Sequence, residues 1–192
     1  DKGALHVDMA SDSVLVGPAP PVESYLNMDA ILAAVELTNA DAVHPGYGFL
    51  SENADFAERL EMEGITFIGP RPETIRQMGD KIESKKIALK AGIPTVPGND
   101  EPILELSVAK RLAKEIGYPI ILKASAGGGG KGMRLVYDAA QLEEALPACI
   151  AEAETSFGDG RVFMEKFITS PRHIEVQILA DSFGHIVHLG ER

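Results

Sequence analysis

The chain has 192 residues, 45% of them hydrophobic and 24% charged, so it can bury a substantial core. Its 18 Lys and Arg residues against 29 Asp and Glu residues give a net charge of −11, which argues against a general affinity for nucleic acid or an anionic membrane. The single cysteine, Cys149, excludes an internal disulfide and fits a reducing compartment.

The ends and the hydropathy of the chain bear on its location. No apolar run approaches the ~18 residues of a membrane span, and no charged and then apolar leader is present. We therefore expect no membrane contact and a cytoplasmic protein, or one of the mitochondrial matrix if the source is eukaryotic. Because the chain opens at Asp1 and stops in what reads as an unfinished strand, we expect a piece of a longer protein.

The first half of the chain predicts two helix-strand units in succession, an arrangement typical of a parallel sheet with helices on its faces. Cap residues, apolar periodicity and a closing glycine define the elements. They are an N-cap at Asn27, a helix to about Thr38, a strand over 41–44, a helix capped at Ser51 or Asn53 and closed at Gly64, and a strand over 65–68.

Two short helices are predicted next, over 72–79 and 80–92. Asp80 and Glu83 have the spacing of a capping box for the second helix. The segment "IPTVPG" that follows contains two prolines and favours no helix. We place a domain boundary near residue 80 and a hinge near residue 95.

The rest of the chain predicts a small α+β module that ends in an antiparallel hairpin. In the last segment, Ile174, Val176 and Ile178 alternate with polar residues, which indicates that one face of the hairpin is turned to solvent or to a ligand. The predicted elements are a helix over 106–116, strands over 119–124 and 133–137, a helix over 139–154, a strand over 162–165 and a hairpin that turns at 181–184.

The segment "KASAGGGGKGM" places five glycines between two apolar runs. Gly127, Gly129 and Gly132 satisfy G-x-G-x-x-G, but a strand rather than a helix follows, which argues against a dinucleotide fold. Met133 stands where a Walker loop would need Lys-Ser or Lys-Thr. A hairpin tip that lays backbone N–H groups over phosphates is favoured over a floppy tip without a role.

Four further sites are candidates for contacts with a ligand, and for each of them a purely structural role is the alternative. Lys123 ends an apolar strand just before the loop, which favours a phosphate contact over solvent. Lys81, in the first turn of a helix, reads from the residues alone as a solvated lysine. Residues 165–167 form either a plain connector or a hinge whose backbone groups hydrogen-bond to the edge of an adenine. His173 is more typical of a half-exposed sheet residue than of a ligand contact.

Six segments occur in an order that resembles the biotin carboxylase component of biotin-dependent carboxylases, a branch of the ATP-grasp superfamily. The resemblance covers essentially the whole chain, and the stretch "GPAPPVESYLNMDAI" is most similar to the propionyl-CoA or methylcrotonyl-CoA type. The six segments are HPGYGFLSEN (44–53), FIGP (67–70), MGDK (78–81), KASAGGGGKGM (123–133), EKF (165–167) and RHIEVQ (172–177).

The resemblance implies an α/β fold in two parts. Residues 1–79 would form the N-terminal, Rossmann-like pre-ATP-grasp domain, incomplete at its start. Residues 80–192 would form an ATP-grasp α+β domain, incomplete at its end, with a mobile lid at about 95–167. The residues that would bind ATP are Lys81 and Lys123 (phosphates), Gly128, Gly129 and Gly130 (lid over the phosphates), Glu165, Lys166, Phe167 and Ile168 (adenine hinge), and His173 (ribose).

In such a family, ATP and bicarbonate give carboxyphosphate, and the CO2 it delivers carboxylates biotin on a carrier domain. The resemblance implies a biotin carboxyl carrier domain and a carboxyltransferase subunit as partners, and a homo-oligomer. Ligands for Mg2+ or Mn2+ and the catalytic residues are expected beyond Arg192, so the chain alone should be inactive. Two alternatives stay open: another ATP-grasp ligase, such as a carbamoyl-phosphate synthase half, and an inactive truncated binding module.

Overall fold

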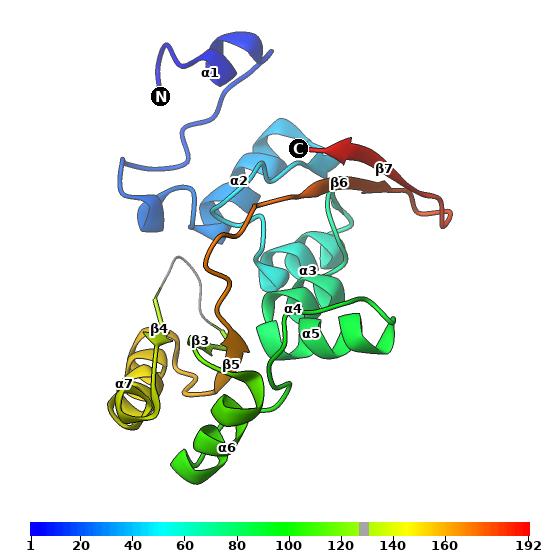
Figure 1. The fold of residues 1–192 in the computed structure, drawn as a ribbon. Helices are drawn as coiled ribbons and strands as arrows, with labels where there is room; N and C mark the ends of the chain where they lie inside the picture. The colour runs from blue at the N-terminus through cyan, green and yellow to red at the C-terminus, as the bar shows by residue number, and fades with distance from the viewer. Residues whose placement is uncertain (127–130) are drawn as a thin grey trace. The chain divides into compact units, whose positions relative to one another are not determined.

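The computed structural model describes residues 1–126 and 131–192. The chain divides into two compact units, Asp1–Thr95 and Val96–Arg192, each of which carries its own helices and strands (Figure 1). The division falls inside "IPTVPG", next to the predicted hinge. The predicted domain boundary near residue 80 stays a prediction.

The first unit is built on a parallel pair of two-residue strands, β1 and β2, in which Ala42 pairs with Thr66 and Val43 with Phe67. The prediction of successive helix-strand units with parallel pairing is thus confirmed. The two short helices at the start were not predicted from the sequence. The elements are α1 Leu5–Met9, η1 Pro21–Glu23, α2 Met28–Thr38, β1 Ala42–Val43, α3 Ala54–Met62, β2 Thr66–Phe67, α4 Pro72–Gly79 and α5 Lys81–Lys90.

Side-chain caps fix the starts of α2 and α3. The side chain of Asn27 accepts a hydrogen bond from the N–H of Ala30 at 3.1 Å, and that of Asn53 accepts one from the N–H of Phe56 at 2.8 Å. Each satisfies a backbone donor that the first turn of a helix leaves unpaired. Of the two predicted caps for α3, Asn53 is therefore the right one.

Of the two reciprocal hydrogen bonds in the capping box predicted for α5, only one forms. Asp80 accepts hydrogen bonds from the N–H groups of Ile82 and Glu83. Its own N–H donates to the carbonyl of Arg76 at the end of α4, and the Glu83 carboxylate pairs with Lys86 instead. The direct succession of α4 and α5 uses the donor that the box would need.

An apolar cluster joins the helices and strands of the first unit. Phe56 and Phe67 meet edge to face, with ring centroids 6.2 Å apart and an interplanar angle of 88°, a geometry that aromatic pairs favour. The buried members of the cluster are Leu32, Val35, Leu50, Phe56, Ala57, Leu60, Phe67 and Ile75.

The second unit contains a three-stranded antiparallel sheet in the order β4-β3-β5 and a separate hairpin of β6 and β7. The predicted hairpin around the glycine loop, the second hairpin and the three remaining elements are present, with ends that differ by up to three residues. The elements are α6 Leu106–Ile116, β3 Ile120–Ala124, β4 Met133–Val136, α7 Ala139–Phe157, β5 Val162–Lys166, β6 Val176–Ala180 and β7 Ile186–Glu191.

Alternation along β3 separates a core face of the sheet from a second face. Ile120, Leu122 and Ala124 are buried among residues of α6 and α7, because α7 packs on all three strands and α6 on β5. The two residues between them, Ile121 and Lys123, point to the opposite face, as the period of two in a strand requires. The helices therefore leave one face of this sheet without a helical cover in the described residues.

The segment that leads into α6 runs beside β5 and extends the sheet by hydrogen bonds that the sequence did not indicate. Lys166 N–H donates to the carbonyl of Pro97 at 2.7 Å, and Ile103 N–H donates to that of Val162 at 2.8 Å. Between them, Asn99 exchanges hydrogen bonds with Met164. Backbone groups at this edge of β5 are thus paired.

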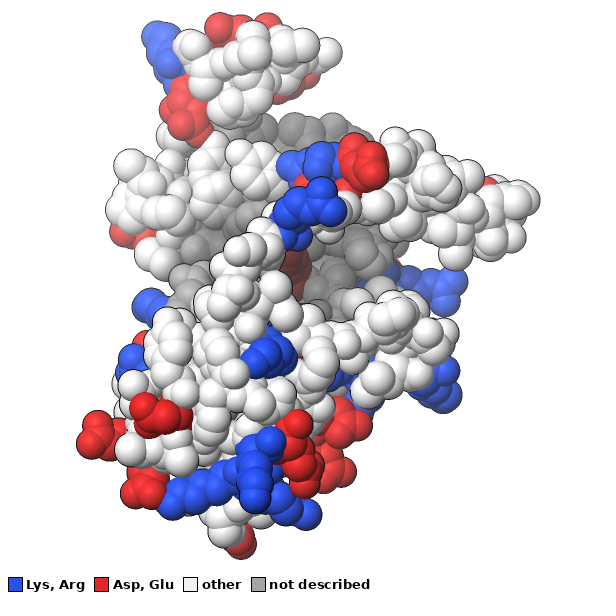
Figure 2. Space-filling view, viewed as in Figure 1, with Lys and Arg blue, Asp and Glu red and all other residues white. Residues whose placement is uncertain are grey.

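The hairpin of β6 and β7 leaves its apolar side chains exposed, and the arm that it forms in Figure 2 is almost entirely white. Asp181 closes the turn by accepting from the N–H groups of Phe183 and His185. A bulge on β7 shifts the register between Val176 and Ile178. Within the described ranges, no helix combines the length and apolar character needed to cross a bilayer.

Candidate functional site

The second face of the β4-β3-β5 sheet groups apolar side chains around a charged pair. Residues directly opposite each other in an antiparallel sheet lie on one face. The register therefore places two rows there, Met133, Lys123 and Phe163 in one and Leu135, Ile121 and Glu165 in the other. Phe163 is buried, whereas Met133 and Leu135 are 40% and 36% exposed.

Lys123 and Glu165, both predicted site residues, meet on this face. Lys123 Nζ lies 2.7 Å from Glu165 Oε2, and the two side chains are only 26% and 14% exposed. They come from adjacent strands, in diagonal positions of the register. The lysine predicted to bind phosphate thus carries a carboxylate partner from the predicted adenine hinge.

The hinge residues after Glu165 differ in whether their backbone N–H groups have hydrogen-bond partners in the described chain. Lys166 N–H and Phe167 N–H donate to the carbonyls of Pro97 and Pro119, at 2.7 and 3.1 Å. Among residues 1–126 and 131–192, the N–H of Ile168 has no hydrogen-bond partner. A ligand edge could therefore pair with Ile168 without breaking a contact within the described chain.

The side chain of Lys166 is held by the protein itself. Its Nζ donates to the carbonyls of Gly117 and Tyr118, at 2.9 and 2.8 Å, just past the end of α6. A cation at a helix C-terminus satisfies carbonyls that lack helical partners and complements the helix dipole. This lysine therefore anchors α6 to β5, and a contribution to a ligand would come from its backbone.

The described residues that flank the glycine loop are tightly joined. The carbonyl of Gly132 accepts hydrogen bonds from Ala124 N–H at 2.7 Å and from Cys149 Sγ at 3.3 Å. Gly132 has a φ of +67°, and a Cβ there would lie 2.7 Å from the Cβ of Ala124, so only glycine fits. Gly128, Gly129 and Gly130, predicted to cover phosphates, lie outside the described residues.

Lys81 and His173 belong to other segments of the chain than the Lys123 pair. Lys81 is the first residue of α5, in the first compact unit. His173 Nε2 lies 3.0 Å from Glu175 Oε2, and its side chain is 84% exposed. The contact with His173, followed by the charge of Arg192, lowers the pKa of Glu175. The structure brings together Lys123 and Glu165 but does not place His173 against them.

A loop in the first unit, residues 44–50, combines an unusual backbone with exposed rings. Phe49 has a φ of +45°, which is rare for a bulky residue, and its ring stacks on Tyr25 with centroids 5.1 Å apart. Tyr47 is 86% exposed. The loop follows the carboxyl end of β1, the edge at which parallel α/β sheets bind ligands. The sequence interpretation assigned this loop no role.

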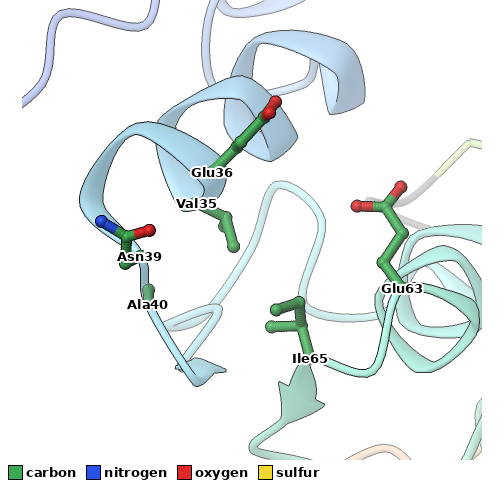
Figure 3. A pocket seen from close by; sticks show the side chains of 6 residues that line it. All are labelled: Val35, Glu36, Asn39, Ala40, Glu63 and Ile65. Carbon is green, nitrogen blue, oxygen red and sulfur yellow. The ribbon is translucent and has the colours of Figure 1, made fainter.

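A cavity of about 350 Å³ lies at the other edge of the first unit (Figure 3). Val35 and Ile65 point into it, and the carboxylates of Glu36 and Glu63 stand at its rim. It lies at the C-terminal ends of α2 and α3, where the helix dipoles disfavour an anion. None of the predicted site residues lines it, so it is a poor candidate for the phosphate site.

Family models match both parts of the chain. Residues 80–192 match the model described as "Carbamoyl-phosphate synthase L chain, ATP binding domain", and residues 1–75 match "Biotin carboxylase, N-terminal domain". The chain is 52% identical, over its whole length, to a biotin carboxylase of Pseudomonas aeruginosa, of which it covers 43%. It is 54% identical to the mitochondrial propionyl-CoA carboxylase alpha chain of Mus musculus, of which it covers 26%.

Solved structures give the same result. A crystal structure of a biotin carboxylase-beta-gamma-ATP complex from Campylobacter jejuni matches with a TM-score of 0.91 and 52% identity, over 100% of this chain and 43% of that one. The biotin carboxylase domain of Hydrogenobacter thermophilus 2-oxoglutarate carboxylase, in complex with MgADP, ADP and bicarbonate, matches with a TM-score of 0.86 and 47% identity, over 97% of this chain and 41% of that one. The chain spans less than half the length of these relatives.

Proposed function

Because this chain belongs to the biotin carboxylase family, we propose that the protein containing it carboxylates biotin, using ATP to activate bicarbonate. A bicarbonate oxygen attacks the γ-phosphorus of ATP and ADP leaves, which gives carboxyphosphate. Carboxyphosphate then releases CO2 and phosphate. The released phosphate takes the proton of the ureido nitrogen of biotin, and this nitrogen bonds to the CO2 carbon. The relatives named above, and the complexes with ATP or with ADP and bicarbonate, support this reaction.

The observation that carries the proposal is the position of Lys123 at the edge of an apolar sheet face, directly before the glycine loop. Ile121, Met133 and Leu135 provide a flat apolar surface beside the Lys123 ammonium. A nucleotide needs both, because its base is flat and largely apolar on its faces while its phosphates carry negative charge. We place the base over the apolar side chains and a phosphate at Lys123.

The hinge residues 165–168 would hold the base by its edge. Lys166 and Phe167 N–H groups serve the fold, so the donor that we assign to the base is the N–H of Ile168. By the motifs that they share with the family, we assign further phosphate contacts to Lys81, Gly128, Gly129 and Gly130, and a ribose contact to His173. For these five residues the family motifs are the support, together with their place in the sequence.

The metal ion would be held elsewhere in the protein. In the part of the chain that the structure describes, no three His, Cys, Asp or Glu side chains gather as a metal site. We propose that the ligands of Mg2+ or Mn2+, and the catalytic residues, lie beyond Arg192. When bound, the ion would offset negative charge on the phosphates during transfer. Residues 1–192 supply the binding of the nucleotide.

The wider setting follows from the relatives. We propose an acyl-CoA carboxylase of the propionyl-CoA or methylcrotonyl-CoA type, with a biotin carboxyl carrier domain, a carboxyltransferase subunit and a homo-oligomeric state. Residues 1–79 would belong to its pre-ATP-grasp domain, incomplete at its start, and residues 80–192 to its ATP-grasp domain, incomplete at its end, with a lid at about 95–167. Bacterial and mitochondrial relatives support a cytoplasmic or mitochondrial matrix location.

A test of the reaction uses the full-length protein with MgATP and bicarbonate, with and without free biotin. We expect ADP formation to rise on addition of biotin, and Lys123→Met to reduce the rate with biotin by about 10- to 100-fold, because a charged contact to the transferred group is lost. Glu143→Gln, at an exposed ion pair between α6 and α7, serves as the control and should leave the rate unchanged.

The family model for residues 80–192 also favours one alternative, an ATP-grasp ligase of the carbamoyl-phosphate synthase type. Such an enzyme would form ADP at a rate indifferent to biotin and dependent on a nitrogen donor. That result would replace the proposed reaction while keeping the nucleotide site. An absence of ADP formation with every substrate would favour a binding module without catalysis.

A further inference from the structure

The cavity at the ends of α2 and α3 combines apolar walls with an anionic rim (Figure 3). Val35 and Ile65 point into it, and Ala40 lines it beside them. All three belong to the apolar cluster of the first unit, in which Val35 is buried and the other two are half-buried. A volume of about 350 Å³ lies near the lower end of the range for small-molecule sites. These walls therefore suit a short aliphatic group.

The backbone around this cavity favours a cation over an anion. α2 ends at Thr38 and α3 ends at Met62, so both helices bring their C-terminal ends to this edge of the first unit. The carbonyls of Leu37 and Thr38 accept no hydrogen bond from any residue that the structure describes. Carbonyls left open in this way carry the negative end of the helix dipole.

Two carboxylates at the rim, Glu36 and Glu63, add full negative charges, and the neighbouring helices offer them no cation. Arg59 is the only basic residue of α2 and α3, and it pairs with Asp29 at 2.8 Å. Arg76, on α4, pairs with two other carboxylates of α3. Within residues 1–126 and 131–192, the side chains of Glu36 and Glu63 have neither an ion pair nor a hydrogen bond. The charge at the cavity is thus left for an external cation.

We propose that this cavity binds a short aliphatic diamine. Its methylene chain lies on the side chains of Val35, Ala40 and Ile65, where it loses contact with water. Its ammonium groups, which are compact charges with three donors each, lie at Glu36 and Glu63. The site shares no residue with the proposed nucleotide site, so the inference stands apart from the proposed function.

The experiment is an NMR titration of the full-length protein, labelled at its isoleucine and valine methyl groups, with 1,4-diaminobutane at constant ionic strength. The methyl resonances of Val35 and Ile65 report on the cavity itself. A parallel titration with 1,4-butanediol offers the same carbon chain without charge. Glu36→Gln, Glu63→Gln and the double variant remove the charges and keep the side-chain shape. Glu61→Gln is the matched control, because Glu61 is an exposed carboxylate of α3 that does not line the cavity.

We expect saturable shifts of both methyl resonances with a Kd on the order of 1 mM for the diamine, and no saturable shift with the diol. Each single variant at the rim should weaken binding about 3-fold and the double variant about 10-fold, whereas Glu61→Gln should match the wild type. The inference is overturned if the diamine causes no saturable shift, or if the diol binds equally well. An unchanged Kd in the double variant, or an equal loss in Glu61→Gln, would also overturn it. None of these outcomes affects the proposed carboxylation.

Discussion

Asn99 and Met164, 65 positions apart in the chain, exchange two hydrogen bonds. Asn99 N–H donates to the carbonyl of Met164 at 3.1 Å, and Met164 N–H donates to Asn99 Oδ1 at 2.7 Å. The amide side chain thus replaces the backbone carbonyl that a neighbouring strand would offer. Since Met164 is fully buried, its N–H has no access to water as a substitute.

Removal of this side chain should weaken the second unit. Asn99→Ala leaves the N–H of Met164 without an acceptor, and we expect the free energy of unfolding to fall by roughly 1–3 kcal/mol. Urea denaturation of the full-length protein measures the change. Asn99→Asp retains an acceptor at the same place and should lose much less. Equal losses for the two variants would contradict a role for the acceptor.

Lys166 is predicted to stabilise the fold through its side chain. Lys166→Met removes both donors from the carbonyls of Gly117 and Tyr118, and we expect a loss of about 1–3 kcal/mol in thermal or urea unfolding. The affinity for MgATP should fall less than it does in Lys123→Met. Lys114→Met, in the last turn of the same helix, is the control with little expected effect. A stable Lys166→Met variant with strongly reduced affinity would show that the side chain binds the ligand.

Gly132 should tolerate no side chain. Gly132→Ala brings a Cβ within 2.7 Å of Ala124 Cβ and adds strain at a φ of +67°, at an expected cost of roughly 2–4 kcal/mol. Gly158 has the same φ with open space around it, so Gly158→Ala isolates the backbone strain, about 1–2 kcal/mol. Differential scanning calorimetry compares the two. A smaller loss at position 132 than at position 158 would refute the close approach of Gly132 and Ala124.

The buried thiol predicts a stability change at alkaline pH. Burial raises the pKa of Cys149 from 9.0 to about 11, with a lowering effect from Arg134 and a raising effect from Glu152. Above pH 9 the unfolded chain loses this proton while the folded chain keeps it, so the unfolded state gains stability as pH rises from 9 towards 11. The expected loss of folding free energy over this window is on the order of 2 kcal/mol.

Cys149→Ala separates this effect from the titration of lysines and tyrosines. The comparison is between the slopes of unfolding free energy against pH for the variant and the wild type, so the cost of the cavity cancels. The wild type should show the steeper fall between pH 9 and 11. Parallel slopes would mean that the thiol does not keep its proton in the folded state.

Local patterns were sufficient to predict much of the fold. Asn53 as a cap, Gly64 as a helix end and the strand after the glycine loop depend on a few neighbouring residues, and the structure agrees with each. The alternation in "PIILKAS" also separates Ile121 and Lys123 from the core. That same signal could have identified Ile121, Met133 and Leu135 as a second apolar face, which the sequence interpretation did not consider.

Contacts between distant segments could not be predicted from local sequence patterns. The pairing of residues 97–103 with β5 joins a proline-containing stretch to a strand that lies 59 to 69 positions away, and prolines argue against a strand. The bond from Lys166 to the end of α6 depends on the same packing. Glu165 carried no signal for its partner either, because an isolated glutamate at a strand end fits a connector equally well.

The most direct test of the account is transfer of isotopically labelled carbon from bicarbonate to biotin by the full-length protein. The wild type should form labelled carboxybiotin only with MgATP, and Lys123→Met should lower the rate by about 10- to 100-fold. Formation of ADP without any labelled carboxybiotin would contradict the proposed reaction. Labelling that is unaffected by Lys123→Met would contradict the site on which it rests.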